Sequence, residues 1–227
     1  MSLQPFGLEA VKPLSSLRSF IDTVRAVSQR RACGEYQPPA YAIDESLTES
    51  PLSVFVGSRS EEINRLASEI ADGVFVAGIP PFRFGEVIGW GRATRPIDVA
   101  LYPTAAFSEE AIEFNRPQMI WGLLNAPQSA RDHLGLSASD LQRAADDLRS
   151  GDEIRAKSLI TDRRLEELIL VGSAEEIGHR LAALVRCYRP SSIGLALTQV
   201  DLSEGVDSTV AAFGVMRSEL GDSQWSG

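Results

Sequence analysis

The sequence is poor in the residues that build disulfides, metal centres and nucleic-acid surfaces. Among 227 residues it has two cysteines, Cys33 and Cys187, whose separation favours a reducing compartment over a disulfide framework. Its acidic residues have no metal-ligand spacing with a supporting histidine, so no metal site is predicted. The formal net charge of −9 and the pI near 4.8 argue against a nucleic-acid partner or an anionic membrane surface.

Long apolar runs are also missing. No run approaches the roughly 20 apolar residues that span a bilayer, and the N-terminus lacks the apolar core of a signal peptide. We therefore expect a cytoplasmic protein without a membrane partner, and we interpret residues 1–3 as an expression remnant. A composition of 44% hydrophobic and 23% charged residues predicts a single globular domain over residues 1–227.

A β-α-β pattern occupies the stretch VFVGSRSEEINRLASEIADGVFV, residues 54–76. Residues 54–56 are typical of a strand buried on both faces, and residues 74–76 predict a second strand. Between them, apolar residues at positions 63, 66, 67 and 70 repeat at helical spacing. Asp72-Gly73 is expected to end that helix, with the glycine in a left-handed conformation.

The turn Gly57–Ser60 allows two interpretations. Ser58 stands three residues before Glu61, which is the pattern of a capping box, and on this reading the turn only begins a helix. The alternative is an anion site, because helix N-termini attract phosphate and Arg59 could add a charged donor. Glu61 and Glu62 would repel an anion, so both interpretations stay open.

Further helices and strands follow the same alternation. A helix is predicted over 14–29 and an irregular connection over 34–51, and the glycines of RFGEVIGWGRAT (83–94) indicate a mobile loop. Strands are predicted over 95–107 and 192–200. The strand–helix alternation indicates parallel strands in an α/β protein, in which we count four such units.

Helix boundaries come from capping residues and proline. Ser108 begins a helical stretch that Pro117 should break, so that one helix ends near Asn115 and another starts near Pro117. Extra helices are predicted behind Ser139 and from Thr161. In VGSAEEIGHRLAALVRCY (171–188), Ser173 and Glu176 form a capping box. For His133 and His179 we favour surface or capping roles over catalysis, and for Trp90 and Trp121 a place in the core.

Several segments together resemble the luciferase-like flavin and deazaflavin oxidoreductases, and most closely their methylene-tetrahydromethanopterin reductase branch. These segments are VFVGSRSEEINRLASEIADGVFVAG (54–78), RPQMIWGLLNAPQSARDHLGL (116–136) and LILVGSAEEIGHRLAAL (168–184). The resemblance implies a parallel (β/α) barrel of the TIM type, of which this chain holds the later four units with extra helices. It departs from the family at Arg59-Ser60 and at 199–201, where the family often has Gly-Pro.

The resemblance implies coenzyme F420 or FMN as cofactor and a small organic substrate. Chemistry in barrels gathers where strands end, so the predicted cofactor-binding residues are Gly57, Ser58, Arg59, Ser60, Gly78 and Ile79. Phe107 and Thr198-Gln199 are further candidates for the pocket wall. The family's residues at the reactive ring belong to the first half of the barrel, so no catalytic residue is assigned.

The resemblance favours an oxidoreductase that transfers hydride or performs monooxygenation. Two alternatives stay open, a non-catalytic flavin-binding protein and an oligomeric remnant without cofactor. An open parallel sheet exposes its edges, and related enzymes are typically dimers, so we expect a homodimer or a higher homo-oligomer. The sequence neither chooses between F420 and FMN nor names the substrate, and it leaves open whether the native gene encodes an upstream half barrel.

Overall fold

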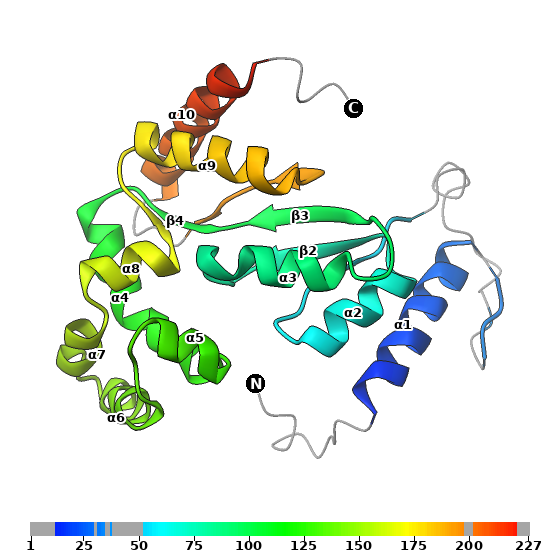
Figure 1. Ribbon diagram of the computed structural model, residues 1–227, viewed down its shortest axis with the longest axis horizontal. Helices are drawn as coiled ribbons and strands as arrows, with labels where there is room; N and C mark the ends of the chain where they lie inside the picture. The colour runs from blue at the N-terminus through cyan, green and yellow to red at the C-terminus, as the bar shows by residue number, and fades with distance from the viewer. Residues whose placement is uncertain (1–11, 30, 35–36, 38–51, 198–201, 222–227) are drawn as a thin grey trace. The chain divides into compact units, whose positions relative to one another are not determined.

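The computed structural model describes residues 12–29, 31–34, 37, 52–197 and 202–221 (Figure 1). The chain divides into two compact units, Met1–Phe75 with Gly89–Asp98, and Val76–Ile88 with Val99–Gly227. Strands β2 (Gly73–Ala77) and β3 (Asp98–Tyr102) and helix α3 (Phe84–Gly91) contribute residues to both. A single domain over residues 1–227 stays a prediction, and most of the predicted irregular connection over 34–51 lies outside the described residues.

The first unit contains the predicted β-α-β arrangement. Its elements are α1 (Pro13–Ser28), β1 (Phe55–Val56), α2 (Glu61–Ile70) and the start of β2. Strands β1 and β2 are parallel, with Phe55 opposite Gly73 and Val56 opposite Val74. Val56 is buried while Phe55 is 37% exposed, so the expectation that this strand is buried on both faces was wrong.

The end of α2 differs from the prediction. The helix ends at Ile70, and its C-cap residue Ala71 is extended, with φ −100° and ψ 165°. Gly73 opens β2 instead of adopting a left-handed cap. A Cβ atom on Gly73 would lie 2.2 Å from a carbon of the Phe55 ring, so the glycine serves the close approach of two strands.

Helix α1, predicted from its apolar spacing, is tied to the β-α-β arrangement through Asp72. The Arg25 guanidinium donates to the Ile70 carbonyl at 2.7 Å and to the Asp72 carboxylate at 2.9 Å, and the carboxylate also accepts from the Val54 amide at 2.9 Å. Partial burial raises the pKa of Asp72, but the bonds from Val54 and Arg25 outweigh it and hold that pKa below its usual range.

The strands of the second unit are parallel and short. Strand β3 (Asp98–Tyr102) pairs with β6 (Ser192–Ile193), and β4 (Thr104–Ala106) lies between β5 (Leu170–Val171) and β7 (Ala196–Leu197). The strand predicted over 95–107 is therefore divided at Pro103, which has no N–H for the ladder. The strand predicted over 192–200 is likewise two short strands, and its last residues lie outside the described part of the chain.

Helices make up most of the second unit. They are η3 (Pro81–Arg83), α3, α4 (Glu109–Leu124), α5 (Gln128–His133), α6 (Ala138–Arg149), α7 (Ile154–Leu159), α8 (Asp162–Leu168), α9 (Ala174–Tyr188) and α10 (Leu202–Leu220). The predicted capping box at Ser173 and Glu176 and the helix start behind Thr161 are confirmed, whereas α6 has Ser137 as its cap instead of Ser139.

Two segments that were predicted to be non-helical are helical in the structure. Helix α4 runs through Pro117 without a break, with Asn115, Arg116 and Pro117 all buried in it. Residues 84–91 form helix α3 instead of a mobile loop, because Phe84, Val87 and Ile88 are buried at helical spacing. In each case burial of an apolar face outweighs a local helix breaker.

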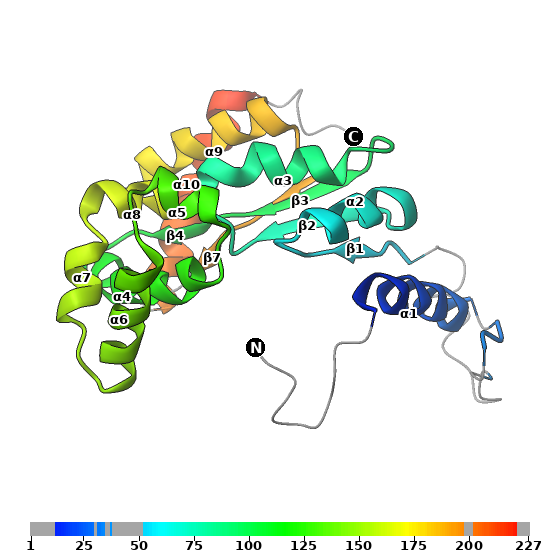
Figure 2. The same ribbon diagram turned by 60° about the horizontal axis from the view of Figure 1, so that its bottom comes forward.

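Helices α9 and α10 lie side by side in both views (Figures 1 and 2). Their shared core includes Leu181 of α9 and Ala212 and Met216 of α10, which pack with Ala105 of β4 and Leu170 of β5. A second core forms where α4, α6, α7 and α8 pack on β4. Helix α10 was not predicted. Within the described residues, none of the helices combines the length and apolar character needed to cross a bilayer.

Candidate functional site

The turn Gly57–Ser60 joins β1 to α2 at the surface of the first unit. Gly57 and Arg59 are exposed, and Ser58 and Ser60 are half-buried. A Cβ atom on Gly57 would lie 3.3 Å from the backbone oxygen of Phe75, tighter than most Cβ contacts. The glycine therefore lets the chain leave β1 close beside β2.

The helix cap is Ser60, so the predicted capping box of Ser58 and Glu61 was wrong. Ser60 has the extended conformation of an N-cap residue, and its hydroxyl accepts from the Ile63 amide at 3.5 Å. The Ser58 hydroxyl accepts from the Ser60 amide at 3.1 Å and so closes the turn. Glu61 is the first helical residue, and its carboxylate pairs with Arg65 at 2.7 Å.

Asn64 of α2 binds the turn from the helix, and the sequence prediction missed it. It is 1% exposed, and its side-chain amide donates to the carbonyl oxygens of Ser58 at 3.0 Å and Ser60 at 2.8 Å. The buried face of α2 is formed by Asn64, Ala67 and Ser68. In the sequence, Asn64 lies four residues after the cap residue Ser60, and Ser68 lies four residues further on the same face. This pair of polar residues on a buried helix face is the signal that could have revealed the contact.

The donors of the turn suit a phosphate group. Among the described residues, the backbone N–H groups of Arg59, Glu61 and Glu62 make no hydrogen bond, and the exposed Arg59 guanidinium forms no hydrogen bond or ion pair with any of them. The hydroxyls of Ser58 and Ser60 each accept a hydrogen bond from a backbone N–H group, so the hydrogen atom of each hydroxyl is still available for donation to a ligand. Amides at a helix N-terminus with a guanidinium are the donors that bind phosphate in proteins. The carboxylates of Glu61 and Glu62 oppose an anion, although Arg65 partly neutralises the first.

Gly78 and Ile79, the other predicted site residues, follow β2 and belong to the second unit. Gly78 has φ +61°, a conformation that favours glycine. The Ile79 residue is 4% exposed, so little of its side chain is open to a ligand. Phe107 is half-buried and packs against the core of α9 and α10. Thr198 and Gln199 lie outside the described residues.

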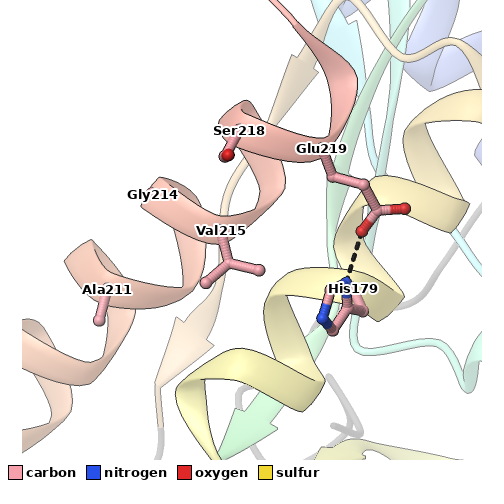
Figure 3. A pocket seen from close by; sticks show the side chains of 6 residues that line it. All are labelled: His179, Ala211, Gly214, Val215, Ser218 and Glu219. Atoms are coloured by element: carbon pink, nitrogen blue, oxygen red, sulfur yellow. Dashed lines mark hydrogen bonds and ion pairs between the residues drawn. The ribbon is translucent and has the colours of Figure 1, made fainter.

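A groove of about 580 Å³ lies along α9 and α10 (Figure 3). Ala211, Gly214, Val215 and Ser218 line it. The Glu219 carboxylate accepts a hydrogen bond from His179 Nδ1 at 2.6 Å. Arg186 also pairs with Glu219. The hydrogen bonds with His179 and Arg186 hold the pKa of Glu219 below its usual range. His179 therefore joins two helices through a hydrogen bond, as expected of a surface residue.

The side chains of His133 and Trp121 also make contacts with neighbouring side chains. The His133 ring stacks on Phe82 with centroids 4.3 Å apart, and its Nε2 lies 2.6 Å from the Glu167 carboxylate. Trp121 is 37% exposed, with the Arg149 guanidinium 5.4 Å from its ring centroid, so the expectation of a core residue was wrong. Within the part of the chain that the structure describes, no three His, Cys, Asp or Glu residues gather as metal ligands would.

Comparison with solved structures identifies the fold. The coenzyme F420-dependent tetrahydromethanopterin reductase of Methanopyrus kandleri matches 99% of this chain and 71% of its own, with a TM-score of 0.71 and 16% identity. A riboflavin lyase with modified FMN and riboflavin matches 96% of this chain and 60% of its own, with a TM-score of 0.51 and 15% identity. The predicted fold class, part of a parallel (β/α) barrel of the TIM type, is confirmed.

Comparison with protein families agrees with this fold. No curated protein sequence matches the chain significantly. The model of the luciferase-like monooxygenase family, however, matches residues 2–188. This match covers the β-α-β arrangement, the turn Gly57–Ser60 and the helices through α9. The chain belongs to the luciferase-like monooxygenase family.

Proposed function

We propose that this chain is an oxidoreductase that binds coenzyme F420 or FMN through the phosphate and acts on a small organic substrate. The observation that carries the proposal is the set of donors at Gly57–Ser60, in a chain of a family whose structural neighbours use F420 or FMN. The reaction would be a hydride transfer or a monooxygenation.

The chain's part in this reaction is to hold and orient the cofactor. The amides of Arg59, Glu61 and Glu62 and the two serine hydroxyls would bind the phosphate, and the Arg59 guanidinium would balance its charge. Gly78 and Ile79 are proposed as further cofactor contacts. The bound cofactor supplies the hydride or oxygen chemistry itself.

Reversal of the charge at Arg59 tests the phosphate site. We expect Arg59→Glu to weaken cofactor binding by about 1.5 to 3 kcal/mol, the range for hydrogen bonds to charged groups. The fold should stay intact because the side chain is exposed. Fluorescence titration of FMN and coenzyme F420 against both proteins measures the dissociation constants.

Arg163→Glu is the matched control for this titration. It makes the same change of charge at a side chain that is 91% exposed on α8 of the other unit. Weaker binding in Arg59→Glu alone supports the site. Equal affinities in Arg59→Glu and the unchanged protein would remove Gly57–Ser60 from the proposal.

A non-catalytic cofactor-binding protein is the second candidate. It is favoured because Arg59-Ser60 stands in the turn where the resemblance to the family leads us to expect Gly-Pro. Bound cofactor without oxidation of its reduced form in the presence of electron acceptors selects this function. A protein that binds neither coenzyme supports a remnant without cofactor.

We also propose a cytoplasmic homodimer or higher homo-oligomer. Strands β5 and β7 are the outer strands of their sheet, and an outer strand leaves backbone donors and acceptors to be covered. Cys33 and Cys187 are both free, as in a reducing compartment. Sedimentation should give at least twice the mass of the 24.6 kDa chain, and a uniform monomer contradicts the proposal.

A further inference from the structure

The side chain of Asn64 binds the turn Gly57–Ser60 from its buried side. Its Nδ2 atom donates to the carbonyl oxygens of both Ser58 and Ser60, at 3.0 and 2.8 Å. One primary amide therefore uses both of its hydrogens on two peptide groups of the same turn. Because Asn64 is 1% exposed, these bonds are protected from competing water.

The direction of these carbonyl groups fixes the direction of two N–H groups. In a planar trans peptide the C=O of one residue and the N–H of the next point in opposite directions. The Ser58 carbonyl shares its peptide plane with the Arg59 N–H, and the Ser60 carbonyl with the Glu61 N–H. With both carbonyls held toward Asn64, both N–H groups are turned to the opposite side of the turn. These are two of the three amides that make no hydrogen bond among the described residues.

The same bonds make one of these donors stronger. The Ser60 carbonyl accepts twice, from the Asn64 side chain at 2.8 Å and from the Asn64 backbone amide at 3.1 Å. A carbonyl that accepts hydrogen bonds polarises its peptide group, which makes the attached N–H a better donor. An anion beside Glu61 would meet a donor that is already oriented, so binding would cost little further ordering of the chain.

We propose that Asn64 is a positioning residue that presets the amides of Arg59 and Glu61 for the phosphate of the bound cofactor. The inference rests on the proposed function, because it assigns a task to a residue behind the proposed phosphate site. Asn64 itself does not touch the phosphate. It acts through two peptide groups, and no other side chain of the described turn binds both of their carbonyl oxygens.

Asn64→Asp provides the test, because it replaces the donor with an acceptor of the same shape. A carboxylate facing two carbonyl oxygens repels them, so we expect the dissociation constants of FMN and coenzyme F420 to rise about tenfold or more. Protonation of the carboxyl group restores one donor. The loss of affinity relative to the unchanged protein should therefore shrink as the pH falls through the pKa of this carboxyl group, which burial and the two facing carbonyl oxygens raise above the ordinary range for Asp. A residue that only stabilises the fold would not produce this pH dependence.

Asn115→Asp is the matched control. Asn115 is also 1% exposed, and its side chain donates to the Ala111 carbonyl at 2.8 Å within α4. The same substitution there should lower the melting temperature but leave both dissociation constants unchanged. Should Asn64→Asp fail to fold, Asn64→Leu removes both donors without adding charge, and it should raise the dissociation constants by a similar factor.

The outcomes separate this inference from the proposed function. Weakened binding in Arg59→Glu and in the Asn64 variants, with Asn115→Asp unaffected, supports both. Weakened binding in Arg59→Glu with unchanged binding in the Asn64 variants overturns the role of Asn64 and leaves the phosphate site in place. Unchanged binding in Arg59→Glu removes the phosphate site, and the role of Asn64 is removed with it.

Discussion

Truncation of Leu181 to alanine should lower the free energy of unfolding by about 2 to 5 kcal/mol, the range for leucines in well-packed cores. Leu181 is 0% exposed and belongs to the core that joins α9 to α10 and to strands β4 and β5. The loss has two contributions: the apolar surface of Leu181 is no longer buried, and a cavity remains because the surrounding helices and strands relax only in part. Urea unfolding followed by circular dichroism measures the change.

Leu202→Ala is the control for the Leu181 variant. It makes the same substitution on α10 at a residue that is 67% exposed, where a change within about 0.5 kcal/mol is typical. A similar loss for both variants would mean that the shared core of α9 and α10 does not stabilise this unit as the structure indicates.

Replacement of Arg116 by alanine should lower the free energy of unfolding by about 2 to 4 kcal/mol. The Arg116 side chain is 10% exposed. Its guanidinium donates to Glu113 at 2.6 Å, to Asp162 at 2.6 Å and to the Ile160 carbonyl at 2.6 Å. These acidic partners, Glu113 first, hold the pKa of Arg116 above its usual range.

Most of this loss should come from the Ile160 carbonyl and from the packing of the arginine stem. Asp162 is 85% exposed and Glu113 46% exposed, so water can solvate both carboxylates once the arginine is gone. Arg143→Ala is the control, because Arg143 forms a surface pair with Asp140 and is 62% exposed. Equal losses in the Arg116 and Arg143 variants would show that the buried bond to Ile160 adds nothing measurable.

The sequence predicted elements well where the determining interactions are local. The capping box of Ser173 and Glu176 is complete in the structure, because both of its hydrogen bonds lie within four residues. The same template failed at Ser58 and Glu61. There a second serine was available, and the buried amide of Asn64 ties the carbonyl of Ser60, which then begins the helix.

Elements that depend on tertiary burial were predicted less well. Pro117 removes a helical hydrogen bond, yet α4 continues because Ile120 and Leu123 are buried and Arg116 is anchored to the segment before α8. Gly91 lies in α3, where a Cβ atom would be 2.8 Å from the Val74 side chain. The burial of residues around Pro117 and the packing of Gly91 against Val74 both depend on residues distant in the sequence, so neither can be predicted from a short segment.

The turn Gly57–Ser60 could be selected from the sequence, because a strand, a glycine and an amphipathic helix follow one another there. Its internal bonding could not be predicted. Asn64 occupies a helical position at which side-chain amides are usually solvent-facing, and only the fold shows that this amide is buried against two carbonyl oxygens. The placement of the cofactor phosphate at this turn stays a prediction.

The most direct measurement of that placement is a titration of isotopically labelled protein with FMN and coenzyme F420, followed by amide NMR resonances. The account predicts that the resonances of Arg59, Glu61 and Glu62 shift first and saturate with the cofactor, because their N–H groups would bind the phosphate. Amides of α10, such as that of Val210, should not move. Saturable binding that leaves the three turn resonances in place would contradict the account.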